Sequence, residues 1–220
     1  WDGTSNLAVD ISLNANNAAY VNAVSGDNSG FASGITLAQD DRSRFFEGTD
    51  FISIPSTATA NLDSVVTISF WAKGNAAYLP ENTTVFEAWD TAGHRVLNIH
   101  LPWSDQNVYW DAGNSGTGAY DRINKAATTA EYEGNWVHWT FVKNARTGWM
   151  RIFKNGVQWR AAVNMRRSMG GIAKIRIGSS CGGDVFYDGN VDDFAMWNTE
   201  VTAATDLQWL YKRIDATHPN

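Results

Sequence analysis

Short runs of alternating apolar and polar residues recur along the chain from about residue 45 onwards. This alternation places every second side chain on one face, so each run predicts a β-strand with one buried face. The clearest runs are residues 67–73, 95–101, 136–143, 172–177 and 191–197. Many short strands separated by turn residues are typical of an all-β sandwich of two sheets.

Three local signals complete the predicted element list. Asn155-Gly156 separates two alternating runs and supplies the pair of positive-φ residues that a type I′ hairpin requires. Leu207, Leu210, Tyr211 and Ile214 recur at helical spacing and predict one short C-terminal helix. Residues 1–50 are rich in Asn, Ala, Gly and Ser, which predicts loops with brief edge strands. Because no linker or internal repeat interrupts the pattern, we expect one domain over residues 1–220.

Composition narrows the class of protein. Hydrophobic residues make up 44% and charged residues 18% of the 220 residues, which predicts a packed core rather than disorder. The net charge of −6 argues against a nucleic-acid partner, because phosphate binding needs a basic surface. No apolar run is long enough to span a membrane. The lone Cys181, in a glycine-rich loop, excludes an internal disulfide, and we expect its thiol to be inert.

The chain begins at Trp1 without a Met, which suggests a processed protein or a piece cut from a larger one. We therefore expect a secreted or cell-surface module. We also expect the protein to be a monomer.

Four motifs resemble one known family. Residues 46–54 are similar to its opening strand pair, and residues 67–73 to a strand of the pattern T-I-S-F-W-x-K. Residues 134–139 followed by Phe153-Lys154-Asn155-Gly156 are similar to its W-x-H and Y-x-N-G pair, and residues 189–198 to its closing strand. In this order and spacing they resemble the concanavalin A-like, laminin-G-like (LamG) domains.

The resemblance implies a concanavalin A-like jelly-roll β-sandwich of two antiparallel sheets with a short C-terminal helix. In this reading Trp136 and His138 are packing residues. The same fold serves lectins, glycan-binding modules, adhesion domains, glycosidases and polysaccharide lyases, so function has to be argued from the site.

Motifs for catalysis are sparse. Retaining glycosidases need two neighbouring carboxylates, and the only period-2 pair, in Glu131-Tyr132-Glu133, lies in a predicted turn beside Gly134. Asn98-Ile99-His100 resembles the Gln-Ile-His strand of alginate-type lyases, and Arg95, Tyr109 and Arg122 could complete such a site. The companion strands of those lyases are absent, so we list no catalytic residue.

Residues 86–122 form the best binding candidate, because they mix aromatic rings with planar polar side chains that suit sugar C–H faces and hydroxyls. The candidate glycan-binding residues are Trp89, Arg95, Asn98, His100, Trp103, Tyr109, Trp110, Asp111 and Arg122. Trp89 and Trp110 could instead fill the core. We therefore expect non-catalytic binding of a polysaccharide or oligosaccharide. The alternatives are a polysaccharide lyase acting on a uronate polymer and a protein-binding adhesion module.

The resemblance also implies a structural calcium ion, bound near the N-terminus and by an Asp that opens the last strand. Asp192 matches that closing Asp, and Asp10 or Asp2 could supply the second carboxylate. Simple alternation places Asp192 on the same face as Phe194 and Met196, where a carboxylate needs a partner or a metal. Alternatively, Asp192 caps the preceding turn.

Overall fold

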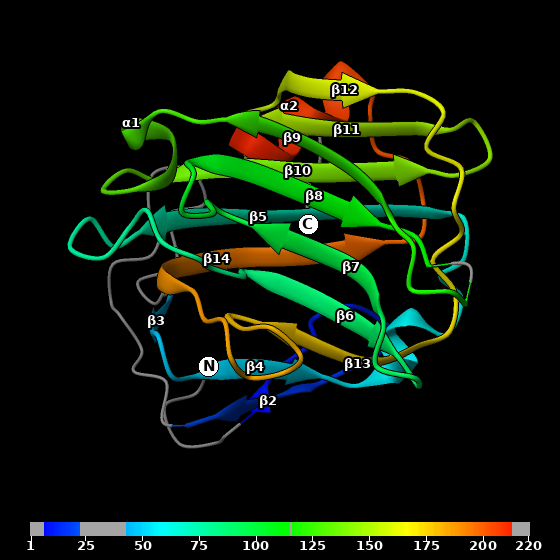
Figure 1. Ribbon diagram of the computed structural model, residues 1–220, viewed down its shortest axis with the longest axis horizontal. Helices are drawn as coiled ribbons and strands as arrows, with labels where there is room; N and C mark the ends of the chain where they lie inside the picture. Colours follow the sequence, from blue (N-terminus) through cyan, green and yellow to red (C-terminus); the bar gives the residue numbers. More distant parts are fainter. Residues whose placement is uncertain (1–6, 23–42, 115, 213–220) are drawn as a thin grey trace.

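The computed structural model describes residues 7–22, 43–114 and 116–212, whose strands pair into two antiparallel sheets (Figure 1). The eight-stranded sheet has the spatial order β1 (Leu7–Ala8), β2 (Ala18–Val21), β4 (Phe51–Ile54), β13 (Ile172–Ile177), β6 (Phe86–Asp90), β7 (Arg95–His100), β8 (Asn107–Ala112) and β9 (Asp121–Ala126). The six-stranded sheet has the order β12 (Val157–Ala162), β11 (Trp149–Lys154), β10 (Val137–Asn144), β5 (Val65–Gly74), β14 (Asp188–Trp197) and β3 (Arg44–Glu47). The helical segments are η1 (Ser56–Thr59), α1 (Thr129–Tyr132) and α2 (Ala204–Lys212). The predicted jelly-roll sandwich with a short C-terminal helix is confirmed; Ile214 lies outside the described residues.

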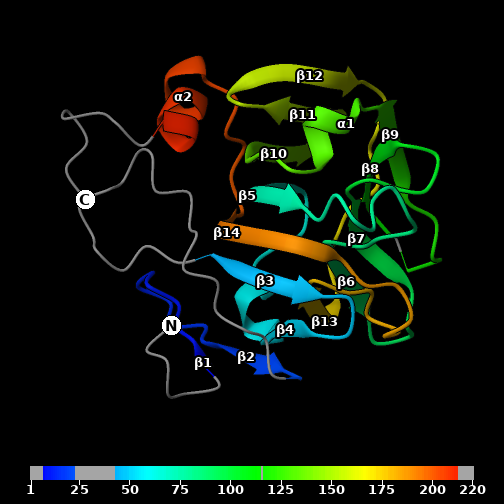
Figure 2. The ribbon, with the colours of Figure 1, turned by 90° about the vertical axis from the view of Figure 1, so that its left-hand side faces the viewer.

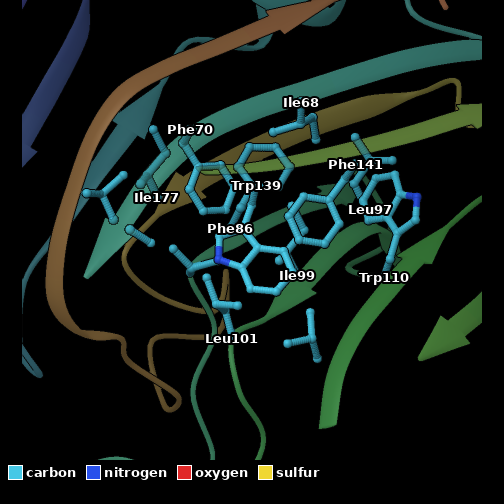
Figure 3. Packing of buried hydrophobic residues seen from close by; sticks show 14 of the residues in the cluster. Ile68, Phe70, Phe86, Leu97, Ile99, Leu101, Trp110, Trp139, Phe141 and Ile177 are labelled. Atoms are coloured by element: carbon cyan, nitrogen blue, oxygen red, sulfur yellow. The ribbon is translucent and has the colours of Figure 1, made fainter. Parts of the chain in front are cut away.

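The core lies between the two sheets and is strongly aromatic (Figures 2 and 3). Phe70 of β5 and Phe141 of β10 stack with their ring centroids 5.8 Å apart. Trp110 of β8 meets Phe141 from the opposite sheet, again at 5.8 Å. Burying such large rings stabilises the fold by about 25 cal/mol per Å² of apolar surface removed from water.

Helix α2 packs on the outer face of the six-stranded sheet (Figure 2). Leu207 packs with Val142 and Phe153, and the ring of Tyr211 lies 5.5 Å from that of Trp71. Beside it, His138 is buried and its Nε2 lies 2.9 Å from the hydroxyl of Ser69, which agrees with a packing role. None of the described helices covers the outer face of the eight-stranded sheet, so that face is left to loops and solvent (Figure 2).

Three local predictions, for a hairpin, a strand pair and a turn, can be compared with the structure. The hairpin at Asn155-Gly156 is confirmed, since both residues have positive φ, 50° and 74°, and Lys154 pairs with Val157. The opening strands β3 and β4 do not pair with each other: β3 joins β14, and β4 joins β13 in the other sheet. The predicted turn at Glu131 is the short helix α1, closed by a capping box with Thr128.

The expected face of Asp192 is wrong, because β14 contains a bulge. Asp193 has φ 50°, and the register with β5 shifts between Asp192 and Ala195. Phe194 points into the core and stacks on Phe70, whereas Asp192 pairs with Trp71, whose ring faces α2. Paired residues of antiparallel strands share a face, so the Asp192 carboxylate lies on the outer side of the sheet.

Candidate functional site

A row of polar side chains crosses the outer face of the eight-stranded sheet. The strand registers pair Arg176 with Glu87, Glu87 with Asn98, Asn98 with Asp111, and Asp111 with Arg122. Directly opposite residues lie about 4.5–5.5 Å apart on one face, so these five side chains are consecutive neighbours across five strands. Three of the predicted site residues, Asn98, Asp111 and Arg122, are therefore brought together. A neighbouring row pairs His100 with Tyr109.

The acids of this row are buried and fully paired. Glu87 is 1% and Asp111 is 0% exposed. The Arg122 guanidinium donates two hydrogen bonds to Asp111, of 2.6 and 2.7 Å. Arg95 donates from Nε to Glu87 at 3.1 Å and from its terminal nitrogen to Asp111 at 2.7 Å, and the Asn98 amide donates to Glu87 at 3.0 Å. Buried charges need such pairing, and here the arginines screen both acids from solvent.

A β-bulge places Arg95 in this network. Regular alternation in β7 would put Arg95 on the same side as the core residues Leu97 and Ile99. The register with β6 instead shifts between Ala88 and Trp89, so that Trp89 opposes Arg95 and the guanidinium reaches the outer face. Bulges re-aim side chains in this way.

Aromatic rings lie above the polar row. The Arg122 guanidinium stacks over Tyr109 at 4.7 Å and over Tyr120 at 5.3 Å. The ring of Trp103 lies 4.4 Å from that of His100, and Tyr109 donates its hydroxyl proton to Asp105 at 2.6 Å. Trp103, Tyr109 and Tyr120 are all partly exposed, so their rings are accessible and held in place by contacts.

His100 is neutral at pH 7. Burial lowers the pKa of His100 to about 4, against a smaller opposing effect of its bond to the Thr83 carbonyl. Nδ1 lies 2.7 Å from that carbonyl oxygen and must carry the proton to donate to it. The lone pair of Nε2 is therefore left as a hydrogen-bond acceptor.

Trp110 does not belong to the site. Its side chain is 0% exposed, it packs on Phe141, and its indole nitrogen donates to the Val142 carbonyl (Figure 3). A ring enclosed between two sheets has no surface for a glycan, so Trp110 is a core residue. Trp89 is partly exposed on the outer face, where Lys174 lies 5.9 Å from its ring centroid.

The loop after β13 borders the site on one side. The Cys181 backbone donates to Glu87 at 2.6 Å, and its carbonyl accepts from Lys174 at 2.6 Å. Burial raises the pKa of the Cys181 thiol to about 12, which agrees with the expected inert cysteine.

Two residues of this site, Glu87 and Tyr120, lie in the predicted binding segment but are not among the predicted glycan-binding residues. Glu87 accepts bonds from β7 and from the Cys181 loop, and Tyr120 stacks on both arginines. A polar Glu87 between the apolar Phe86 and Ala88 was a usable signal for an outward-facing strand position.

A shallow depression of about 520 Å³ lies next to the turn that carries Trp103. Ser104, in the same turn as Trp103, lines it together with Glu81, Asn82 and Asp184.

Two of the predicted calcium ligands, Asp10 and Asp192, accept hydrogen bonds from residues close to them in sequence. Asp10 accepts bonds from the Ser12 backbone and hydroxyl and from the Asn16 backbone, at 2.7–2.9 Å. Asp192 accepts one from the Asp193 backbone at 2.8 Å. Asp2 lies outside the described residues. Within residues 7–22, 43–114 and 116–212, no three His, Cys, Asp or Glu side chains gather as a metal site. The calcium site therefore stays a prediction.

Known structures share this fold. Domain 4 of an extracellular arabinanase from Geobacillus stearothermophilus, solved with arabinotriose, has a TM-score of 0.66 and 15% identity, over 88% of this chain and 87% of that one. The binding domain of botulinum neurotoxin serotype G has a TM-score of 0.66 and 14% identity, over 92% of this chain. The binding domain of botulinum neurotoxin DC, in complex with SialylT, has a TM-score of 0.56 and 15% identity, over 96% of this chain.

This chain spans about half the length of the two toxin domains, 47% and 46%. At such low identity these likenesses establish the fold alone. A comparison with curated protein sequences finds no match. In the part of the chain that the structure describes, no helix is long and apolar enough to cross a membrane. A laminin-G family described as the concanavalin A-like lectin/glucanases superfamily matches residues 46–205, and the chain belongs to this family.

Proposed function

We propose that the outer face of the eight-stranded sheet binds a carbohydrate and does not cleave it. One observation carries the proposal: the partly exposed rings of Tyr109 and Tyr120 lie against Arg122, which a buried acid fixes, and the partly exposed Trp103 packs on His100 in the neighbouring row. Aromatic rings stack on the C–H faces of sugars, and planar polar groups bond their hydroxyls. A surface whose side chains are already held loses little conformational entropy on binding.

The contacts favour binding over hydrolysis. Glycoside hydrolysis needs one carboxyl group to donate a proton and a second to act as nucleophile or base. Glu87 and Asp111 are the acids of the row, and both are buried and bonded to guanidinium groups. Neither is free to approach a sugar.

The contacts also disfavour the lyase alternative. Asn98 is 0% exposed and its amide is bonded to Glu87, so it does not present itself to a uronate carboxylate. With a pKa of about 4, His100 is a weak base. The bond to Asp105 raises the pKa of the Tyr109 hydroxyl, which hinders proton removal by Tyr109.

Two of the similar structures support the proposal. The arabinanase domain was solved with arabinotriose, and a neurotoxin binding domain was solved with SialylT. The arabinanase is extracellular, and we propose a secreted or surface location for this chain as well.

The test is a glycan array followed by titration calorimetry on the glycan that binds best. Trp103→Ala should weaken binding by roughly 1–3 kcal/mol, because an aromatic anchor is lost. Trp149→Ala is the matched control, since Trp149 is exposed at the edge region of the other sheet and stacks on Arg151. An array without any bound glycan, or equal affinities for the two folded variants, would contradict the proposal.

A further inference from the structure

A second depression, of about 490 Å³, lies at the opposite end of β14. Trp197 and Asn198 line it from the end of that strand, and Asn14, Asn16, Thr57 and Asn61 line it from the N-terminal segment and from η1 and its flank. The first depression is lined by residues that directly precede β14. Ten strand residues at about 3.3 Å each therefore separate the two depressions by roughly 30 Å.

The lining is rich in amide side chains with unused hydrogen-bonding groups. Within the described part of the chain, the side chains of Asn14, Asn61 and Asn198 make no hydrogen bond. Asn16 accepts one from the Thr57 hydroxyl at 2.9 Å, which leaves its two N–H donors unused. Each free amide offers a donor and an acceptor side by side, the arrangement that matches neighbouring hydroxyl groups.

The rest of the lining is apolar. Leu62 is buried, Met196 packs against the core, and the Trp197 ring is partly exposed. Among the described residues that line it, none has a titratable side chain. A ligand that carries a full charge would therefore find no counter-charge, whereas an uncharged ring with hydroxyl groups would find both an indole and amides.

We infer that this amide-lined depression is a second saccharide site, which takes neutral sugar units. Its volume lies in the range of about 300–1,000 Å³ that is usual for small-ligand sites. The inference rests on residues that the proposed sheet-face site does not use. Together with the sheet-face site, this depression would let the protein hold a polysaccharide at two points, which raises avidity without new contacts.

The experiment follows side-chain amide and indole signals by NMR on the full chain. The probes are three neutral trisaccharides: arabinotriose, cellotriose and laminaritriose. We expect saturable shifts of the Asn61 and Asn198 amide signals and of the Trp197 indole signal with at least one probe. Asn61→Ala and Asn198→Ala should each weaken that binding by about 3- to 10-fold, the usual effect of losing a hydrogen-bonding partner.

Both variants should keep the wild-type melting temperature, because neither amide makes an intramolecular bond among the described residues. Asn135→Ala, an exposed asparagine outside the lining, is the control and should leave affinity unchanged. The shifts should persist in Trp103→Ala, so the two sites can fail separately.

Three results would overturn the inference: no shift with any probe at millimolar concentration, unchanged affinity in both Asn variants, or shifts with calcium chloride alone, which would indicate a cation site.

Discussion

Replacing Asp111 by Asn tests whether the site depends on the buried acid. The carboxylate is 0% exposed and accepts three hydrogen bonds from two arginines, at 2.6, 2.7 and 2.7 Å. An Asn keeps the shape, but it removes the charge and turns an N–H donor toward guanidinium groups that can only donate. Arg95 would keep its ion pair with Glu87, whereas Arg122 would lose the acid that it pairs with.

The expected loss in the free energy of unfolding depends on how deeply Asp111 and its two arginine partners are buried. Breaking a fully buried ion pair costs about 3–5 kcal/mol, because the remaining charge is left without a partner. The arginine side chains are 26% and 39% exposed, so solvent stabilises them in part. We therefore expect Asp111→Asn to lower the free energy of unfolding by about 2–4 kcal/mol. For a chain of this size that corresponds to a melting temperature lower by about 4–16 °C.

The assay is urea and thermal unfolding, monitored by tryptophan fluorescence and circular dichroism. Asp63→Asn is the control, because Asp63 is exposed and forms no ion pair in the described part of the chain. This variant should change the free energy of unfolding by no more than about 0.5 kcal/mol. Adding Arg122→Met to Asp111→Asn should cost little more, since their interaction is already lost. A loss below about 1 kcal/mol in Asp111→Asn would refute the view that Asp111 anchors the arginines.

The remaining predictions concern pH, metal and thiol chemistry. The pKa of His100 is about 4 in the folded protein and 6.5 in the unfolded chain, so below pH 6.5 the unfolded chain binds a proton that the folded protein does not. The free energy of unfolding is therefore unaffected by His100 above pH 6.5 and decreases as pH falls towards 4. The loss approaches about 3 kcal/mol, and His100→Gln should flatten that part of a pH series of unfolding curves; an unchanged slope would contradict this. If calcium binds, chelator should lower the melting temperature by several degrees and Asp192→Ala should remove the effect; identical curves would leave Asp192 without a metal role. Cys181 should react with a thiol reagent only after unfolding, and rapid labelling of the native protein would show that its burial is transient.

The sequence by itself determined the sandwich and its local turns. Alternation in residues 67–73 and 97–101 fixes which side chains face the core, and Asn155-Gly156 sets its hairpin through φ alone. The same alternation in β8 groups Trp110 with Val108 and Ala112, which are buried, and so favours the core position of Trp110. These features depend on neighbours along the chain, so a single sequence is enough to find them.

Only the tertiary structure decided the site. Glu87, Asn98 and Asp111 lie in one row because the registers of β6, β7 and β8 align them. The bulge opposite Trp89 turns Arg95 outward, and the bulge after Asp192 reverses the expected face of that carboxylate. Register and bulges are set by pairing between segments far apart in sequence, and a shift of one residue exchanges the two faces of a strand, so local alternation cannot determine them.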